Sequence, residues 1–158
     1  VARRYFTYLD DSKAKVAVVT GDARLSFEQA GAKYDLIVLD AFSGGAIPVH
    51  LLTREAFRLY GSRLTRRGLI AVHVTNRFLN LRPALAAAAR AEGLLAAARQ
   101  TDFKRMVQEH YFSSWALLGR DPATIGRLRE AGWESLDRQP PARAWTDGYV
   151  SLLRALRS

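Results

Sequence analysis

Short apolar runs alternate with amphipathic stretches along this chain, and the run that begins after Tyr34 is the clearest of them. Residues 34–40 have the sequence YDLIVLD, with four consecutive apolar side chains at positions 36–39. Such a run predicts a strand buried on both faces, as found in parallel sheets. Ligands of open α/β sheets bind beyond the carboxyl ends of the strands, so we expect Asp40 at a functional edge. The alternative is that Asp40 caps the next turn or helix.

The other elements follow from apolar periodicity and from capping and stop signals. Apolar runs predict further strands over residues 15–20, 69–74, 94–100 and 111–118. Helical spacing predicts helices over residues 1–9, 25–30, 48–64, 81–92, 121–131 and 149–156. We expect Ser26 and Asn80 to cap their helices, Pro48 to open the third helix and Gly93 to end the fourth. We expect a turn at 66–68, a loop or hairpin connection at 101–110 and a linker at 139–141.

Strands and helices alternate, so the predicted class is α/β with a mainly parallel sheet. The last strands follow each other with little helix between them, which predicts an antiparallel edge. A length of 158 residues fits a single domain, 1–158. The chain opens on Val1 rather than Met, inside an expected helix, and we therefore expect the true N-terminus to lie upstream.

Composition narrows the function classes. The net charge is +9, but the basic residues are spread along the chain without a block of five, which favours a solvated surface over a nucleic-acid interface. Attraction of an anionic partner stays open. The absence of cysteine removes disulfides and thiol chemistry and suits a reducing cytosol. The three histidines, His50, His73 and His110, have no metal-ligand spacing, and Ser43 lacks the G-x-S-x-G context of a hydrolase.

Four segments together resemble one family. They are ARRYF at residues 2–6, GDAR at 21–24, YDLIVLD at 34–40 with IPVHLLT at 47–53, and WTD at 145–147. In this order they are similar to the spermidine synthase-like proteins, the aminopropyltransferase branch of the Rossmann-type S-adenosylmethionine-dependent methyltransferase superfamily. The resemblance implies a three-layer Rossmann-like methyltransferase fold, mostly parallel with an antiparallel edge strand, that lacks its first βαβ portion. It is strongest to the bacterial subgroup in which this domain often follows a membrane transporter-like segment. That implies a cytoplasmic domain, tethered to a membrane where such a segment is fused upstream.

The resemblance also implies roles for particular residues. The family transfers an aminopropyl group from decarboxylated S-adenosylmethionine to putrescine in polyamine biosynthesis. Asp22 matches the acid that meets the adenine amino group, and Ala23 would let the backbone approach the ring. Asp40 matches the catalytic acid that accepts a proton from the attacking amine. Ser43 and His73 are the candidate contacts to the amine substrate, with a hydrogen-bonded core position as the alternative for His73. No metal is expected.

Three departures from the family pattern keep other functions open. The chain contains no G-x-G-x-x-G loop, it has Ser43-Gly44-Gly45 where a second acid helps to hold the diamine, and it has Gly148 after Asp147. We therefore expect the segment by itself to be inactive. The alternatives are a non-catalytic relative acting as an interaction or regulatory domain and a methyltransferase that uses S-adenosylmethionine. Strands at 15–20 and 34–40 without the intervening strands would expose backbone edges, which predicts low stability or pairing with another chain, such as a second copy.

Overall fold

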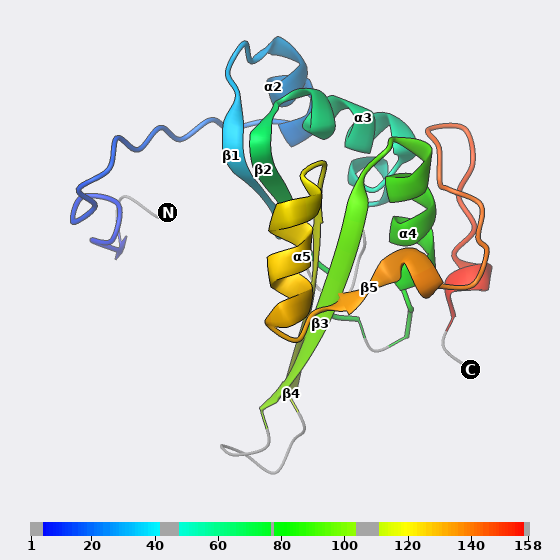
Figure 1. Cartoon of the computed structure of the whole chain (residues 1–158). Coiled ribbons are helices and arrows are strands. Elements are labelled where there is room, and N and C mark those ends of the chain that lie inside the picture. The colour runs from blue at the N-terminus through cyan, green and yellow to red at the C-terminus, as the bar shows by residue number, and fades with distance from the viewer. Residues whose placement is uncertain (1–4, 42–47, 77, 104–110, 157–158) are drawn as a thin grey trace.

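The computed structural model describes residues 5–41, 48–76, 78–103 and 111–156 (Figure 1). Five strands form one sheet in the order β1-β2-β4-β3-β5. The strands are β1 (Tyr34–Leu39), β2 (Leu64–His73), β3 (Leu95–Phe103), β4 (Tyr111–Gly119) and β5 (Glu134–Ser135). The helices are α2 (Ala23–Gln29), α3 (Arg54–Ser62), α4 (Arg82–Ala91) and α5 (Pro122–Glu130), with short 3-10 turns η1 (Val49–Leu51), η2 (Leu136–Arg138) and η3 (Leu153–Ala155).

The predicted α/β class is confirmed, and the described sheet is more antiparallel than the alternation of elements suggested. β1 and β2 are parallel, with Ile37 opposite Ile70. β4 lies antiparallel between β2 and β3, and β5 is antiparallel to β3. The difference arises because β3 returns as the neighbouring strand β4 without a crossover helix, and β4 then occupies the place beside β2.

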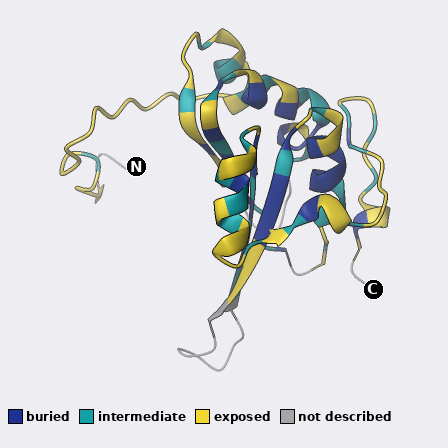
Figure 2. Cartoon of the chain, viewed as in Figure 1, coloured by how far each residue is buried: buried dark blue, intermediate teal, exposed yellow. Residues whose placement is uncertain are grey.

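Helices cover both faces of the sheet, which gives three layers (Figure 1). The main core lies between the sheet and the pair α3 and α4, where Phe57, Tyr60 and Leu85 meet Ile70 and Leu118. α5 packs on the opposite face of β3 and β4, with Ile125 almost fully buried. Figure 2 shows the buried residues gathered between these layers, whereas residues 5–20 are almost entirely exposed.

Alanine packing explains why β3 forms despite its weak strand propensity. Ala86, Ala88 and Ala89 of α4 are buried against the same core as Ala96 and Ala98 of β3. Small side chains let the helix approach the sheet closely, so tertiary packing overrides the helical preference of alanine. The predicted hairpin of β3 and β4 is confirmed, and residues 104–110 of its connection lie outside the described residues.

The double burial predicted for β1 is wrong for the described residues. Ile37 and Leu39 are buried, whereas Leu36 is 54% and Val38 is 53% exposed. The two pairs point to opposite faces of the sheet because side chains alternate along a strand. The helices that cover the Ile37 face have no described counterpart over Leu36 and Val38.

The prediction of a strand at 15–20 is also wrong. These residues pair with no described strand, and Val16, Val18 and Val19 are exposed. A strand needs a neighbour to take up its backbone hydrogen bonds, and the segment instead runs away from the sheet (Figure 1). Of the helix expected at 1–9, residues 1–4 lie outside the described residues, and Thr7–Asp10 form a turn.

Three local predictions need correction. Residues 66–68 belong to β2 rather than to a turn. The register between β1 and β2 shifts at this point, because Tyr34 pairs with Leu64 whereas Leu36 pairs with Leu69. Residues 149–156 form only the short turn η3 rather than a helix: Tyr149 closes a tight turn with Thr146, and Leu156 pairs with Leu79. The cap of α2 is Asp22 rather than Ser26.

The remaining helix signals are confirmed in part. Pro48 precedes the 3-10 turn η1 rather than the α-helix itself, and α3 begins only after a break at 52–53, where Thr53 provides the cap. The N-cap of α4 is Leu81, without a side-chain cap hydrogen bond, rather than the predicted Asn80, although Asn80 accepts the Arg82 N–H. Gly93 follows α4 with a φ of +64°, the left-handed conformation that favours glycine. Among the described helices, none is both long and apolar enough to cross a bilayer.

Candidate active site

The carboxyl ends of the parallel strands β1 and β2 bring an acid and a histidine together. Asp40 follows β1, and His73 is the last residue of β2. Leu39 pairs with Val72, so the next residues along the two strands are neighbours at the same edge of the sheet. His73 Nδ1 lies 2.8 Å from Asp40 Oδ1. The histidine side chain is 25% exposed and the carboxylate 56%, so the carboxylate keeps an open side for a ligand.

The second ring nitrogen of His73, Nε2, also has a hydrogen-bond partner. Thr75 Oγ1 lies 2.5 Å from His73 Nε2 and also accepts the Ser114 backbone N–H at 2.9 Å. The indole of Trp115 stacks on the imidazole with a centroid distance of 4.8 Å. Nδ1 can donate its proton to the Asp40 carboxylate, while Nε2 and the Thr75 hydroxyl share a second hydrogen bond. His73 therefore orients the Asp40 carboxylate rather than competing for its exposed side.

Asp22 stands at the first turn of α2. Its Oδ1 accepts the backbone N–H groups of Arg24 at 2.7 Å and Leu25 at 3.1 Å. These hydrogen bonds, with that of Leu25 as the largest cause, hold the pKa of Asp22 below its usual value. Its Oδ2 lies 3.7 Å from His50 Nε2. An exposed, ionised carboxylate of this kind can accept a hydrogen bond from an exocyclic amine.

A second ion pair links α2 to the C-terminal segment. Arg24 donates from both terminal nitrogens to Asp147, at 2.7 and 2.6 Å. Thr53 Oγ1 donates to the same carboxylate at 2.8 Å, and the Asp147 N–H donates to Glu55. The hydrogen bond from Arg24 is the main cause that holds the pKa of Asp147 below its usual value. This bidentate brace fixes the WTD segment beside the start of α2.

The structure thus divides the predicted site residues into two described clusters. Asp40 and His73 are in direct contact, whereas Asp22 and Ala23 lie at the start of α2 beside His50. Ser43 lies outside the described residues. The catalytic and binding roles of all five residues stay predictions. Within the described ranges, no group of three His, Cys, Asp or Glu side chains is placed to hold a metal ion.

Sequence reasoning missed the partners of these residues. Thr75 lies two positions after His73, and the period of two along a strand could have placed both on one side of the chain. The stacking of Trp115 depends on β4 pairing with β2, which has no local signal. The WTD motif pointed to Asp147 but not to Arg24, which is 123 residues away in the sequence.

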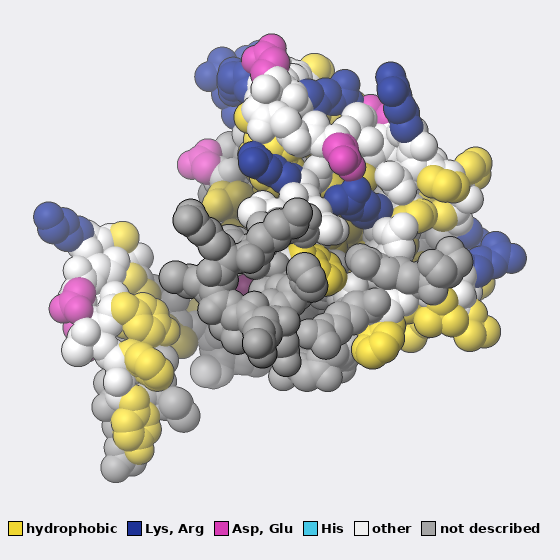
Figure 3. Space-filling view, turned by 90° about the horizontal axis from the view of Figure 1, so that it is seen from below, with side chains coloured by type: hydrophobic (Ala, Val, Ile, Leu, Met, Phe, Trp, Pro, Cys, Tyr) yellow, Lys and Arg dark blue, Asp and Glu magenta, His cyan; other side chains and the backbone are white. Residues whose placement is uncertain are grey.

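On the face shown in Figure 3, Lys and Arg side chains are scattered over the described surface rather than gathered in one patch.

The chain is similar to known proteins in sequence and in fold. No family model matches the chain. Over 76 residues the chain is 40% identical to a polyamine aminopropyltransferase of Vibrio vulnificus. The match covers 46% of this chain and 25% of that protein. Its fold matches the crystal structure of a probable spermidine synthase from Corynebacterium glutamicum with a TM-score of 0.53 and 20% identity, over 85% of this chain and 55% of that one. The chain therefore spans about a quarter of the length of the curated relative it matches.

Proposed function

We propose that this spermidine synthase-like chain, which has the Rossmann-type methyltransferase fold, forms the acceptor side of an aminopropyl transfer site. The reaction would move the aminopropyl group of decarboxylated S-adenosylmethionine to an amine. The observation that carries the proposal is the pair of Asp40 and His73 at the carboxyl edge of β1 and β2, with the carboxylate more than half exposed. The similarity to the Vibrio vulnificus aminopropyltransferase supports it.

Asp40 would act on the amine. A protonated amine is not a nucleophile, so the acceptor must lose a proton before its nitrogen can attack. The Asp40 carboxylate attracts the cation, orients it and takes up that proton, while His73 keeps the carboxylate in place through Nδ1–H. The new bond joins the amine nitrogen to the carbon on sulfur. The carbon–sulfur bond breaks, and its electron pair stays on sulfur.

The sulfonium group of the donor supplies the leaving group for this displacement. The described residues fit the adenine end of such a donor, because Asp22 offers an ionised acceptor at the start of α2. Ala23 lies in the same first turn and carries only a methyl group, so it leaves the backbone accessible. The sequence lacks a glycine-rich loop, so these residues hold only part of the nucleoside. The resemblance to the spermidine synthase-like family suggests the cytoplasm as the place of this proposed reaction.

The test is the identity of the product. The full-length protein is incubated with an amine and either decarboxylated or ordinary S-adenosylmethionine, and the nucleoside products are identified by mass spectrometry. The proposal predicts methylthioadenosine from the decarboxylated donor. Release of S-adenosylhomocysteine from the ordinary donor alone would instead show a methyltransferase. Turnover of neither donor, at concentrations where the nucleoside binds, would show a non-catalytic relative and overturn the proposal.

A further inference from the structure

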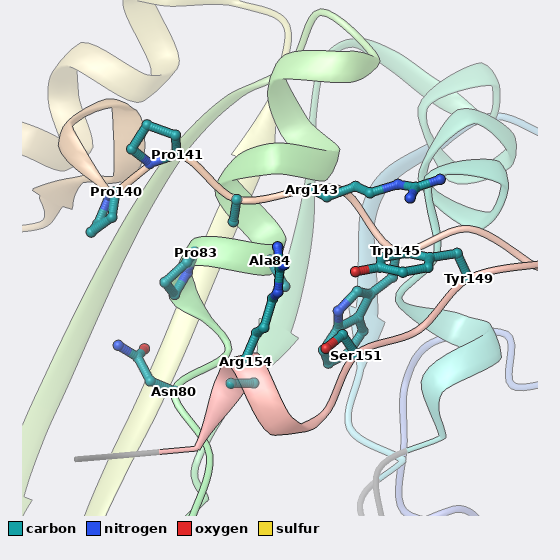
Figure 4. A pocket seen from close by; sticks show the side chains of 12 residues that line it. Asn80, Pro83, Ala84, Pro140, Pro141, Arg143, Trp145, Tyr149, Ser151 and Arg154 are labelled. Carbon is teal, nitrogen blue, oxygen red and sulfur yellow. The ribbon is translucent and has the colours of Figure 1, made fainter.

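A cavity of about 320 Å³ lies on the α4 side of the molecule. It opens between the start of α4, the proline linker and the C-terminal segment, as Figure 4 shows. Neither Asp40, His73 nor Asp22 lines it. Its volume is within the range of pockets that hold small organic molecules.

The inner wall of the cavity is apolar and tied to the rest of the fold. Trp145 is 3% and Ala155 is 7% exposed, and both belong to the main core. The Trp145 carbonyl accepts the Arg54 N–H, and the Ala155 carbonyl accepts the Asn80 N–H, each at 2.7 Å. Because both ends of the C-terminal segment are anchored in this way, the cavity is formed before any ligand arrives.

Two guanidinium groups border this apolar wall. The Arg143 guanidinium lies over the ring of Tyr149, 4.0 Å from its centroid. Arg154 extends from η3 toward Ala84 of α4 (Figure 4). No carboxylate of the described residues forms an ion pair with either arginine. Two positive charges therefore stand beside an apolar surface, and the part of the chain that the structure describes places no acid in an ion pair with them.

We propose that this cavity binds a small organic anion with a flat apolar body, an aromatic carboxylate being the simplest case. The ring would lie against Pro83 and Ala84, which are more exposed than Trp145 behind them. The carboxylate would accept hydrogen bonds from Arg143 and Arg154. Guanidinium groups bind carboxylates with strong, directional hydrogen bonds, and an apolar ring gains by leaving water. The site is independent of aminopropyl transfer, because its residues are not those proposed for that reaction.

A matched pair of probes tests the charge requirement. 2-Naphthoate and its neutral isostere 2-naphthamide are titrated into the full-length protein by calorimetry. We expect naphthoate to bind about tenfold or more tightly than naphthamide, since a hydrogen bond to a charged group is worth roughly a factor of ten. Equal affinity for the two probes, or no binding of naphthoate, would overturn the proposal.

Variants locate the site. Arg143→Gln and Arg154→Gln should each weaken naphthoate binding about tenfold, whereas Arg90→Gln, the same charge change at the far end of α4, should leave it unchanged. In nitrogen-labelled protein, the indole N–H signal of Trp145 should shift on binding while those of Trp115 and Trp133 stay in place. Equal weakening by all three variants, or a shift confined to Trp115, would contradict the assignment to this cavity. Ser151→Leu, which fills the cavity from its rim, should also abolish binding while the circular dichroism spectrum is unchanged.

Discussion

Glu92 links the two helices that cover the main core, and its removal gives a pH-dependent prediction. Glu92 directly follows α4, and its side chain is only 10% exposed. Its carboxylate accepts from Arg54 Nε at 2.7 Å and from Arg58 Nε and Nη2 at 3.1 Å. Burial raises the pKa of Glu92, but the hydrogen bonds from the two guanidinium groups outweigh burial and leave this pKa below its usual value.

The expected cost of Glu92→Gln follows from these contacts. Hydrogen bonds to charged groups contribute about 1.5–3 kcal/mol each. The arginine side chains are 43% and 59% exposed, so solvent screens the pair. Gln also retains one oxygen acceptor. We therefore expect a loss of about 1–2 kcal/mol in the free energy of unfolding at pH 7.

The sign of the pH dependence is fixed by the lowered pKa. A carboxylate whose pKa is depressed in the folded state stabilises the protein above its unfolded pKa, about 4.3 for Glu. That contribution disappears as the pH falls through the folded pKa. Glu92→Gln should therefore cost stability at pH 7 and little near pH 3 or below.

Urea unfolding followed by tryptophan fluorescence at both pH values measures this effect. Glu130→Gln, at the exposed end of α5, is the control for the loss of one negative charge. The reasoning would be refuted if Glu92→Gln cost the same at pH 7 and pH 3, or if it cost no more than Glu130→Gln at pH 7.

Three further changes test other parts of the structure. The Tyr60 hydroxyl is buried without a hydrogen-bond partner among the described residues, and burial raises its pKa to about 12; Tyr60→Phe should leave the free energy of unfolding unchanged or raise it by about 1 kcal/mol, and a loss in urea unfolding would contradict this. Gly119→Ala would place a methyl carbon 2.8 Å from Leu69 Cδ2 and should cost about 1–3 kcal/mol, visible as a lower melting temperature. Asp147→Asn weakens the brace to Arg24 and should lower the free energy of unfolding by only about 0.5–1 kcal/mol at pH 7, because solvent screens the 46% exposed carboxylate. The pKa of Asp147 is lowered in the fold, so this loss of stability should vanish in acid. A loss of the same size at pH 3 would argue against the ion pair.

Local patterns predicted most of the described core elements. The apolar run of β1, the end of α4 at Gly93, the start of α5 and the hairpin of β3 and β4 all follow from period, capping or turn signals. The wrong predictions concern residues whose structure depends on neighbouring elements of the fold. Val18 belongs to a good strand sequence that has no described strand beside it, and Leu36 belongs to a buried pattern with no described cover.

The candidate site was predictable to a similar extent. Asp40 could be placed at the sheet edge because a strand run ended in an acid, and His73 because it lies near the carboxyl end of the next predicted strand, 69–74. The hydrogen bond between them required the register of β1 and β2, which a slip of several residues sets at the start of these strands. Trp115 and Arg24 contribute to the site through contacts with residues far away in the sequence, and no local sequence pattern predicts such contacts.

The most direct measurement on the central claim compares turnover and nucleoside binding in Asp40→Asn, with Asp35→Asn at the other end of β1 as the matched control. Both variants are made in the full-length protein, and transfer to an amine is measured alongside calorimetric titration of methylthioadenosine. The account predicts that Asp40→Asn loses aminopropyl transfer and keeps nucleoside affinity, while Asp35→Asn keeps both. Undiminished turnover in Asp40→Asn would contradict the account.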